Sequence, residues 1–437
     1  MNPPRFADHR QHFVLLQAAI ARAADPGRAV AAHLSRSRRG IRIDARLFPL
    51  TSNSRVVVVA FGKAAAGMAQ AAAEILGDAW AQGLAVIPHG STLRALGKAE
   101  IIEAGHPLPD QGSLLAGRAA QRLLAGLQPQ DYLLALISGG GSAMLELPLK
   151  GLSLEDLRAT QNLLLRSGAP IEDLNLVRRG LSLVKGGGLA RFASPARALG
   201  LILSDVVGDP LTAIASGPTV LAPAPRQGAA LRVLRRYKLE ARVPADVLTA
   251  LRSAPPPRRP TPRPFNRIVA SNRIALDAAT EQAEKLGFQV QVITRRMVGE
   301  ARRVGSDLAH RARRPVRRPT ALLLGGETTV VVRGGGRGGR NQELALSAAL
   351  ELEGSPAVAL MALATDGVDG QTDAAGAIVS GETAFRLRAE GVDPAAALEA
   401  NDSYPALDKI GALIRTGATG TNVNDVVVVL KYPSPEG

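Results

Sequence analysis

The feature of this chain that most constrains its fold is a short apolar run that ends in glycine or a small polar residue and precedes a helix-like segment. Val56–Ala60 runs into Gly62, and Asp131–Ile137 runs into a loop of three glycines. Ala198–Leu203 ends in the same way at Ser204. Uninterrupted apolar runs are typical of strands buried on both faces of a parallel sheet, with helices covering those faces. The sequence therefore predicts an α/β fold with mainly parallel sheets.

The length of the chain requires more than one core. It has 437 residues, of which 46% are hydrophobic and only 3% are aromatic. Because a domain usually has roughly 100–200 residues, we expect two or three domains with cores of Ala, Leu and Val. We predict an N-terminal Rossmann-like α/β domain over residues 1–237 and a C-terminal α/β domain over 320–437. Between them, 238–319 is predicted to connect the two through Pro- and Arg-rich linkers such as Ser253–Pro264, and to add a βαβ piece to the second domain.

The composition also excludes several classes of chemistry. The chain has no cysteine, which excludes disulfides, thiolate zinc sites, iron–sulfur clusters and cysteine nucleophiles. No window reaches the ~18 uninterrupted apolar residues of a membrane span. The N-terminus is polar and lacks the apolar core of a signal peptide. We expect a soluble, cytoplasmic protein without a membrane partner.

The net charge of +15 comes from 53 basic and 38 acidic residues and favours anionic ligands. Many of the arginines lie in runs beside Pro and Ala, as in Arg311–Arg318. We interpret these runs as solvated surface. Aromatic residues that could stack on bases are scarce near them, so nucleic-acid binding is not expected.

A glycine loop after one apolar run is the strongest local signal. It consists of Ser138, Gly139, Gly140, Gly141 and Ser142. Glycines let the backbone approach a ligand closely, and the free amides of such a turn can bind phosphate. A tight turn without a ligand is the alternative, but three consecutive glycines flanked by serines exceed what a turn requires. The loop is neither a Walker loop nor a dinucleotide fingerprint, because it lacks the Lys-Ser/Thr pair and the required glycine spacing.

Lys63 lies where another predicted strand ends and a helix begins. Ligands of open α/β sheets bind at the carboxyl ends of strands, where an ammonium can stabilise a transferring phosphoryl group. The alternative is a surface lysine. A cation at a helix start is unfavourable, which supports a functional role.

Three carboxylates follow predicted strands. Asp205 and Asp209 come after Ala198–Leu203, and Asp366 comes after Ala357–Ala364. Such carboxylates suit magnesium ligation or proton abstraction from a substrate hydroxyl. Helix capping and turn formation are the alternatives.

The last third of the chain has two further glycine-rich segments. Gly325 and Glu327 follow the predicted strand Ala321–Leu324, and a loop with two arginines ends in Arg340 at the entry of a helix. Guanidinium groups pair bidentately with phosphate or carboxylate, so Arg340 is a candidate anion ligand. Thr328–Val332 is predicted to be a strand.

Together, these segments resemble the bacterial and animal glycerate 2-kinases, whose C-terminal half is called the MOFRL domain. The resemblance covers nearly the whole chain. The motifs that carry it are Gly62–Ala65, Ala104–Pro107 with Pro109 and Asp110, Ser138–Ser142, Val177–Arg178, Lys185–Gly187, Leu203–Thr219, Gly325–Thr329, Gly339–Glu343, Thr365–Gly376, Asn401–Ser403 and Thr419–Asp425.

The resemblance implies phosphorylation of D-glycerate to 2-phosphoglycerate with ATP and Mg²⁺, in a cleft between two α/β/α domains. The functionally important lysine and arginine of the family fall on Lys63 and Arg340. Our hypothesis assigns both residues to charge stabilisation on the transferring group, and Asp205 to acceptance of the hydroxyl proton.

The remaining assignments follow the same hypothesis. The nucleotide is expected along the loop 138–142, with Gly325 and Glu327. Arg178 and Asp366 are candidates for binding glycerate. The candidate magnesium ligands are Asp205, Asp209 and Asp366.

Two other functions compete with the kinase. The first is a nicotinamide-dependent reductase of hydroxypyruvate or tartronate semialdehyde, against which the missing dinucleotide fingerprint argues. The second is a sensor that binds ATP without turnover. Glycerate is the expected small-molecule partner, and a second copy of the chain is a candidate partner.

Overall fold

The computed structural model of the chain describes residues 4–91, 93, 95–221, 226–253, 260–355 and 357–433. Part of the predicted linker Ser253–Pro264, residues 254–259, lies outside this range. The chain divides into two compact units. The parallel-sheet unit is Pro26–Val269, and the mixed-sheet unit combines the residues up to Asp25 with those from Ala270 onward. No helix in the described ranges is long and apolar enough to cross a membrane.

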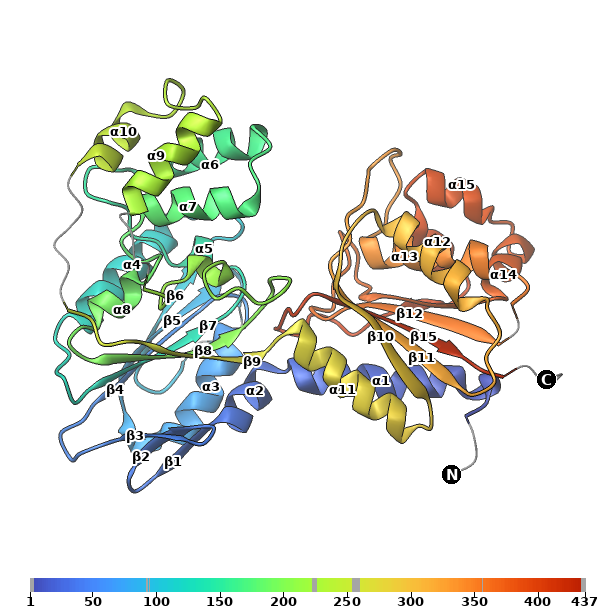
Figure 1. Ribbon diagram of the computed structural model, residues 1–437, viewed down its shortest axis with the longest axis horizontal. Helices are drawn as coiled ribbons and strands as arrows, with labels where there is room; N and C mark the ends of the chain where they lie inside the picture. Colours follow the sequence, from blue (N-terminus) through green and yellow to red (C-terminus); the bar gives the residue numbers. More distant parts are fainter. Residues whose placement is uncertain are drawn as a thin grey trace. The chain divides into compact units, whose positions relative to one another are not determined.

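The parallel-sheet unit is built on a six-stranded sheet of order β6-β5-β4-β7-β8-β9 (Figure 1). Its strands are β4 (Val56–Phe61), β5 (Trp80–Pro88), β6 (Ala99–Ala104), β7 (Tyr132–Ile137), β8 (Arg197–Leu203) and β9 (Phe265–Ala270). The pairs β5–β6, β4–β5, β4–β7 and β7–β8 are all parallel. The predicted parallel sheet is confirmed here, and the predicted strand at Val56–Ala60 is buried along its whole length.

Helices cover both faces of this sheet. Val57, Val59 and Phe61 share one apolar cluster with α4 (Gln111–Leu124), and α3 (Ala65–Leu76) also packs on β4. Because successive strand residues point to opposite faces, a fully apolar strand needs cover on both sides. The smaller elements of this unit are α2 (Pro26–His33), η2 (Gly77–Ala79), α5 (Gly141–Met144), α8 (Gly188–Phe192), η3 (Ile214–Ser216), and an antiparallel meander of β1 (Leu34–Ser37), β2 (Gly40–Ile43) and β3 (Arg46–Pro49).

Four helices form a separate layer beyond the glycine-loop edge of the sheet (Figure 1). They are α6 (Leu154–Arg166), α7 (Ile171–Leu181), α9 (Arg226–Arg236) and α10 (Ala245–Arg252). Their apolar stripes, which include Leu164, Val177 and Leu234, form one cluster of their own. The Ser153 hydroxyl and the Asp156 carboxylate form a capping box that fixes the start of α6.

The mixed-sheet unit has a six-stranded sheet of order β10-β11-β15-β12-β13-β14. The strands are β10 (Gln289–Met297), β11 (Thr320–Gly326), β12 (Val358–Ala364), β13 (Gly376–Ser380), β14 (Leu413–Ile414) and β15 (Asp425–Lys431). Only β10 and β11 are parallel, and the other four pairs are antiparallel. This sheet differs from the predicted mainly parallel one because the last strand, β15, inserts between β11 and β12 and runs against both.

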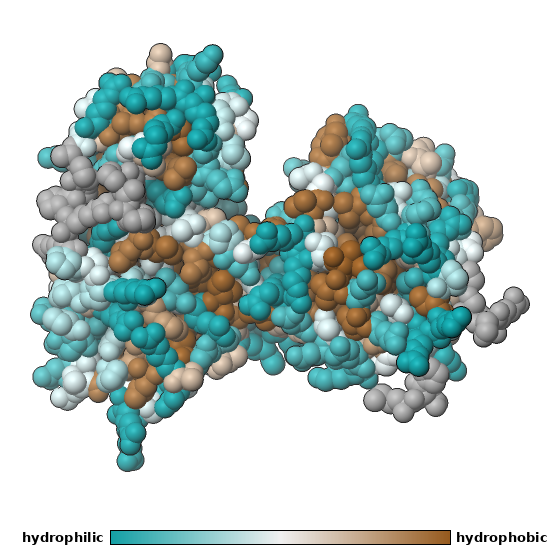
Figure 2. Space-filling view, viewed as in Figure 1, coloured by the Kyte–Doolittle hydropathy of each residue, from teal (hydrophilic) through white to brown (hydrophobic). Residues whose placement is uncertain are grey.

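The helices of the mixed-sheet unit lie on the two faces of this sheet (Figure 1). On one face, α1 (His9–Ala24) packs on α11 (Asn272–Lys285). On the other face, α12 (Ala301–Ala312) packs on α13 (Arg340–Leu352). The remaining elements are η1 (Phe6–Asp8), α14 (Thr383–Ala389), α15 (Pro394–Glu399) and α16 (Ser403–Lys409). In Figure 2, hydrophilic residues cover much of the visible face of each unit, as expected when helices turn their polar sides outward.

The predicted strand Thr328–Val332 does not form. Only Thr329 makes an isolated bridge, to Glu300, and its amide donates to the Gly299 carbonyl. The segment lies beyond the end of β11, where no neighbouring strand of the sheet continues its ladder, and Val332 is 77% exposed.

The division of the chain into two compact units groups the first long helix, α1, with the residues from Ala270 onward. The sequence-based boundaries at residues 237 and 319 stay a prediction. Helix α1 belongs to the mixed-sheet unit. There, His12 Nδ1 on this helix lies 3.0 Å from the Tyr432 hydroxyl.

Because α1 belongs to the mixed-sheet unit, truncation of its fully buried residue Phe13 should destabilise that unit and not the other. We expect Phe13→Ala to destabilise the mixed-sheet unit by about 3–5 kcal/mol, because a large core side chain is lost. Hydrogen exchange should accelerate in α11 and remain unchanged in β4 and β7. Val14→Ala on the same helix, where Val14 is 59% exposed, is the control and should cost less than about 0.5 kcal/mol. Equal acceleration in both units would contradict the assignment.

Candidate active site

The candidate site of the parallel-sheet unit lies where the strand order reverses. From β4 the chain continues to β5 and β6 on one side and then returns to β7 and β8 on the other. Because all these strands are parallel, the loops after β4 and β7 leave the same edge side by side. Open α/β sheets bind ligands at such a switch point. Lys63 follows β4, and the glycine loop 138–142 follows β7.

The two loops are joined by hydrogen bonds. The Lys63 amide donates to the Gly139 carbonyl at 2.8 Å, and the Ala64 amide donates to the Ser138 hydroxyl at 3.0 Å. Gly62 allows this approach, since it has a φ of +112° and a Cβ on it would lie 2.4 Å from the Ser138 hydroxyl. The Lys63 loop and the glycine loop are therefore one structural element.

The three glycines make room for side chains from other loops. A Cβ on Gly139 would lie 2.0 Å from the Asp205 carboxylate, and one on Gly140 would lie 3.0 Å from the His106 ring. A Cβ on Gly141 would meet the Phe61 ring at 2.9 Å. The loop thus brings Lys63, Asp205 and His106 to one place.

This place can bind an anion. Within the described residues, the Gly139 and Gly140 amides donate no hydrogen bond and the Lys63 ammonium has no ion pair. Burial, and secondarily the Lys63 charge, lower the pKa of His106, so its imidazole is neutral at neutral pH. Free amides beside a lysine are a recurrent phosphate-binding arrangement.

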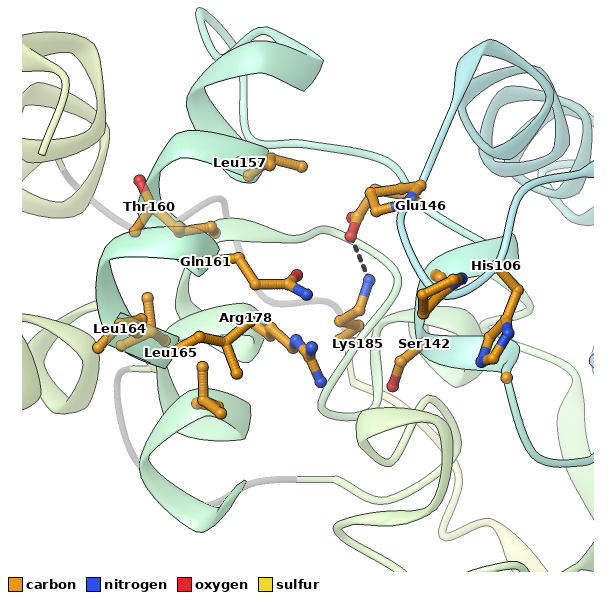
Figure 3. Close-up of a pocket in the computed structure, with 17 residues that line it drawn as sticks. His106, Ser142, Glu146, Leu157, Thr160, Gln161, Leu164, Leu165, Arg178 and Lys185 are labelled. Carbon is orange, nitrogen blue, oxygen red and sulfur yellow. Dashed lines mark hydrogen bonds and ion pairs between the residues drawn. The ribbon is translucent and has the colours of Figure 1, made fainter. Parts of the chain in front are cut away.

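A cavity of about 350 Å³ adjoins the glycine loop (Figure 3). Leucines and a valine of α6 and α7 line one side, among them Leu157, Leu164 and Val177. Gln161 of α6 and Arg178 of α7 also extend into the cavity, and the polar side opposite these helices carries His106, Ser142, Glu146 and Lys185. Arg178, a predicted substrate ligand, lies in this cavity.

A buried ion pair forms part of the polar side. Lys185 and Glu146 are 1% and 5% exposed, and the Lys185 ammonium donates to the Glu146 carboxylate. Burial lowers the pKa of Lys185, and the Glu146 charge opposes that effect. With Arg178, the pair gives the cavity a net positive charge of about one, which suits a carboxylate or phosphate ligand.

A chain of hydrogen bonds connects Arg178 to the glycine loop. The Ser142 and Ser216 hydroxyls are 2.8 Å apart, and Ser216 donates to the Asn175 side-chain oxygen at 3.0 Å. Arg178 Nη1 donates to the same oxygen at 3.4 Å. The orientation of Arg178 is therefore coupled to the loop that follows β7.

The predicted residues of the mixed-sheet unit also meet at one edge of their sheet. In the β-ladder, Asp425 pairs with Gly326 on one side and with Ala364 on the other. Arg340, at the start of α13, donates to both Asp425 oxygens at 2.6 and 2.9 Å and lies 3.2 Å from Glu327. A Cβ on Gly325 would lie 1.9 Å from the Asn272 side-chain oxygen, so close packing alone requires a glycine at this position.

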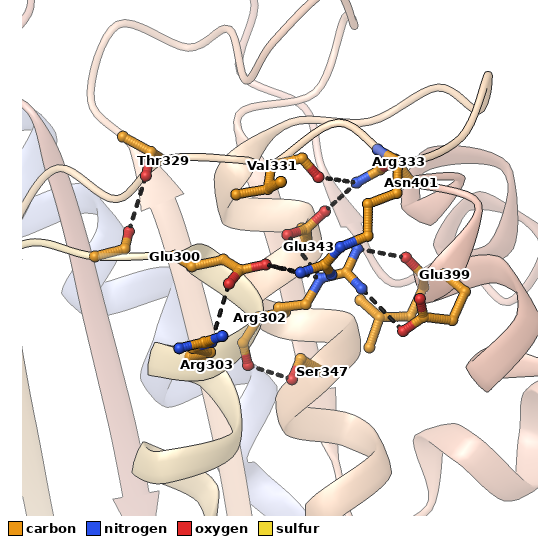
Figure 4. Close-up of polar contacts among 12 residues, drawn as sticks. Glu300, Arg302, Arg303, Thr329, Val331, Arg333, Glu343, Ser347, Glu399 and Asn401 are labelled. Atoms are coloured by element: carbon orange, nitrogen blue, oxygen red, sulfur yellow. Dashed lines mark hydrogen bonds and ion pairs between the residues drawn. The ribbon is translucent and has the colours of Figure 1, made fainter. Parts of the chain in front are cut away.

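A polar network holds the glycine-rich loop that leads to Arg340 (Figure 4). The Asn401 side-chain oxygen accepts from the amides of Arg333 and Gly334 at 2.6 and 3.0 Å. Its nitrogen donates to the buried Glu343 carboxylate at 2.8 Å. Arg302 pairs with the other Glu343 oxygen at 3.4 Å.

The candidate magnesium ligands lie in both units. Asp205 and Asp209 are on the loop after β8, and Asp366 follows β12 in the mixed-sheet unit, where its carboxylate accepts from the Val368 amide at 3.1 Å. Among the described residues, no group of three His, Asp or Glu side chains is arranged to hold a metal ion. The three-carboxylate set stays a prediction.

Sequence reasoning assigned no role to Glu146, Lys185 or Asp425. Glu146 stands alone in the apolar run Ala143–Leu149, and a solitary carboxylate in such a run is the signal that indicates a buried partner. Asp425 similarly begins the apolar strand β15. The partner of each lies far away in the chain and could not be named.

These features define a class: a two-unit α/β protein with a cationic cavity beside a topological switch point. Two family models match the chain, the domain of unknown function DUF4147 over residues 13–252 and the MOFRL family over 320–425. D-glycerate 2-kinase of Thermotoga maritima is 44% identical over 87% of this chain and 92% of its own length. A protein of Agrobacterium vitis, named putative hydroxypyruvate reductase, is 41% identical over 87% and 88%.

A solved structure agrees with these matches. The crystal structure of glycerate kinase from Thermotoga maritima superimposes with a TM-score of 0.87 and 40% identity, covering 97% of this chain and all of that one. This chain belongs to the glycerate kinase family, as the sequence motifs indicated.

The Glu146–Lys185 pair predicts strong coupling in stability. Lys185→Met leaves a buried carboxylate without its cation and should cost about 3–5 kcal/mol. The double variant Lys185→Met/Glu146→Gln should recover most of that loss, because the glutamine oxygen can still accept from the Leu147 amide. Denaturant unfolding of the four forms measures the coupling, with Lys150→Met, at an exposed position, as the control. Additive effects would contradict a direct interaction.

Asp369 predicts a pH dependence. Burial raises its pKa to about 6, although the amides of Asn341 and Gln342 at the start of α13 donate to it. Since an unfolded aspartate titrates near ~3.9, the folded state holds more protons between about pH 4 and 6. Stability of the parent should therefore fall by on the order of 2–3 kcal/mol as pH rises through that window. Asp369→Asn should lack this component in unfolding measured across the window; parallel curves would contradict it.

Proposed function

We propose that this chain is an ATP-dependent kinase that phosphorylates D-glycerate to 2-phosphoglycerate. The observation that carries the proposal is the joined Lys63 and glycine loops at the switch point, in a chain of the glycerate kinase family. The D-glycerate 2-kinase of Thermotoga maritima matches this chain over nearly its whole length.

Glycerate is a small acid with two hydroxyls, and the cavity offers groups of matching chemistry. Arg178 can pair with its carboxylate through two N–H donors, as guanidinium groups do. The adjacent Lys185–Glu146 pair adds to the positive field and holds the polar side rigid. Gln161 and Ser142 face the same space and can hydrogen-bond hydroxyls (Figure 3).

The glycine loop supplies the phosphate contacts. The Gly139 and Gly140 amides are proposed to donate to phosphate oxygens of ATP, and the Lys63 ammonium to stabilise the charge that develops on the transferring group. Asp205, which packs against Gly139, is the proposed acceptor of the hydroxyl proton. Preorganised donors of this kind do most of the work in phosphoryl transfer.

We propose Mg²⁺ as the cofactor, with carboxylates of this site as its ligands. Mg²⁺ prefers oxygen ligands and usually takes one or two carboxylates together with substrate phosphates, so a complete protein cage is not required. Asp205 and Asp209 would hold it from the loop after β8, and Asp366 is the third proposed ligand. When bound, the ion would neutralise negative charge on the phosphates of ATP.

The mixed-sheet unit is proposed to contribute Arg340 together with Gly325 and Glu327. Arg340 is fixed by Asp425 and Glu327 and retains further N–H groups that can donate to a phosphoryl oxygen. Asp366 is also the proposed second glycerate ligand.

The reductase alternative is not favoured. One relative is named for it, but the glycine loop 138–142 at the switch point lacks the dinucleotide fingerprint spacing, and residues 334–339, which have that spacing, do not directly follow a strand. We also propose a cytoplasmic location, supported by the absence of cysteine, and small molecules as the partners, with a second copy of the chain as a further candidate.

A product assay tests the function. With D-glycerate, ATP and Mg²⁺, the protein should form 2-phosphoglycerate, identified against 3-phosphoglycerate by a coupled enolase reaction. Lys63→Met should lower kcat by about 100-fold or more, since a fixed charge-stabilising donor is lost. Lys150→Met removes the same charge at an exposed position and should keep parental turnover. If the protein oxidises NADH with hydroxypyruvate and transfers no phosphoryl group, the reductase function replaces the kinase proposal. If Lys63→Met keeps the parental activity, Lys63 has no role in the mechanism.

A further inference from the structure

A second cationic cavity lies in the mixed-sheet unit, at the sheet edge opposite Asp425. Its volume is about 230 Å³, and it is lined by residues that include Arg313, Arg314, Ser355, Lys431 and Tyr432. Asp425 and Lys431 are the first and last residues of β15, so they lie about 20 Å apart along one strand. The cavity is therefore separate from the edge that carries Arg340.

Lys431 is the unusual residue of this cavity. It is only 6% exposed, and its position is fixed by strand pairing with Thr320 and Val358. Across the described ranges, its ammonium has neither an ion pair nor a hydrogen bond. Burial lowers the pKa of Lys431, and the charges of Arg311 and Arg314 lower it further. A buried, unpaired ammonium beside other cations is costly unless an anion accompanies it.

The basic run Arg311–Arg318 supplies the other cations. In the part of the chain that the structure describes, none of its arginine side chains forms an ion pair. The opposite end of the same helix, α12, is different: Arg302 and Arg303 both pair with Glu300. Arg311 and Arg313 lie at the C-terminal end of α12, where the helix dipole favours cations, but this does not explain the buried Lys431 beside them.

We propose that this cavity binds a small anion carrying a phosphoryl group. Lys431, Arg313 and Arg314 place about three positive charges at one cavity, which a single carboxylate would leave mostly uncompensated. A phosphoryl group carries about −1.5 to −2 charges and three acceptor oxygens, and guanidinium groups bind it bidentately. The Ser355 hydroxyl can add a neutral donor.

The size of the cavity selects a small ligand. Sites for drug-sized ligands usually have about 300–1,000 Å³, so this one suits inorganic phosphate or a phosphorylated acid of a few carbons. A nucleic-acid backbone needs an open groove with accessible cations, and Lys431 is nearly inaccessible. Tyr432 also lines the cavity, and its hydroxyl lies 3.0 Å from His12 Nδ1, which holds the ring in place.

Local hydrogen exchange in the full-length protein tests the proposal, with inorganic phosphate and 2-phosphoglycerate as separate probes. Either probe should slow exchange in the peptides that contain Arg313–Val316 and Val358–Ala364. Chloride at the same ionic strength should not. In titrations, Lys431→Met should weaken the apparent affinity by about tenfold or more, as expected for loss of one charge-assisted hydrogen bond.

Two further variants separate the site from general charge effects. Arg314→Gln, at an exposed position that does not threaten folding, should also weaken binding. Arg317→Gln removes the same charge outside the lining and should bind like the parent. Tighter protection by phosphate identifies a free-phosphate site, and tighter protection by 2-phosphoglycerate identifies a phosphorylated acid. Equal protection by chloride, protection only by duplex DNA, or unchanged binding in both Lys431→Met and Arg314→Gln would overturn the proposal. Because none of these variants touches the candidate active site, kinase activity is tested separately.

Discussion

The parallel pairing of β4 with β7 is the constraint on which the candidate site depends. Phe61 pairs with Ile137, so both strands end at the same level and release their loops side by side. The hydrogen bond from the Lys63 amide to the Gly139 carbonyl then locks the two loops together. Every residue of β4 and nearly all of β7 are buried, so packing on both faces of the sheet holds the strand ends and the loop that carries Lys63 in place.

The glycine loop shows that packing and function need not be competing explanations. At Gly139 and Gly140 a side chain from another loop approaches the position of a Cβ, the Asp205 carboxylate at Gly139 and the His106 ring at Gly140, and Gly140 also has a φ of +80°. These side chains are themselves candidates for chemistry. A loop that lacks its own side chains therefore concentrates the functional groups of its neighbours, while its Gly139 and Gly140 amides stay available to a ligand.

Local patterns were enough to predict the buried strands, the parallel sheet and the residues at strand ends, such as Lys63, Ser138 and Asp205. They failed where the answer depends on residues far apart in the chain. Lys185 and Glu146 are 39 residues apart, and Arg340 and Asp425 are 85 apart. The mixed sheet was missed for the same reason: the apolar run Val426–Leu430 predicts a strand but carries no information on its insertion between β11 and β12. The roles of individual site residues remain proposals, because the pattern of residues shows chemistry but not the bound geometry.

The basic residues of this chain differ in whether a carboxylate lies beside them, and the composition alone does not show this difference. Arg302, which supports the fold, is surrounded by the carboxylates of Glu300, Glu343 and Glu399. Within the described residues, Lys63 and Lys431 have no such partner. Charge balance inside a protein is favourable when partners are preorganised, so a partly or wholly buried cation without a carboxylate indicates that its counter-charge comes from a ligand. The argument that leads us to propose phosphate at the Lys63 loop thus also applies to the cavity around Lys431, where no catalytic group is needed.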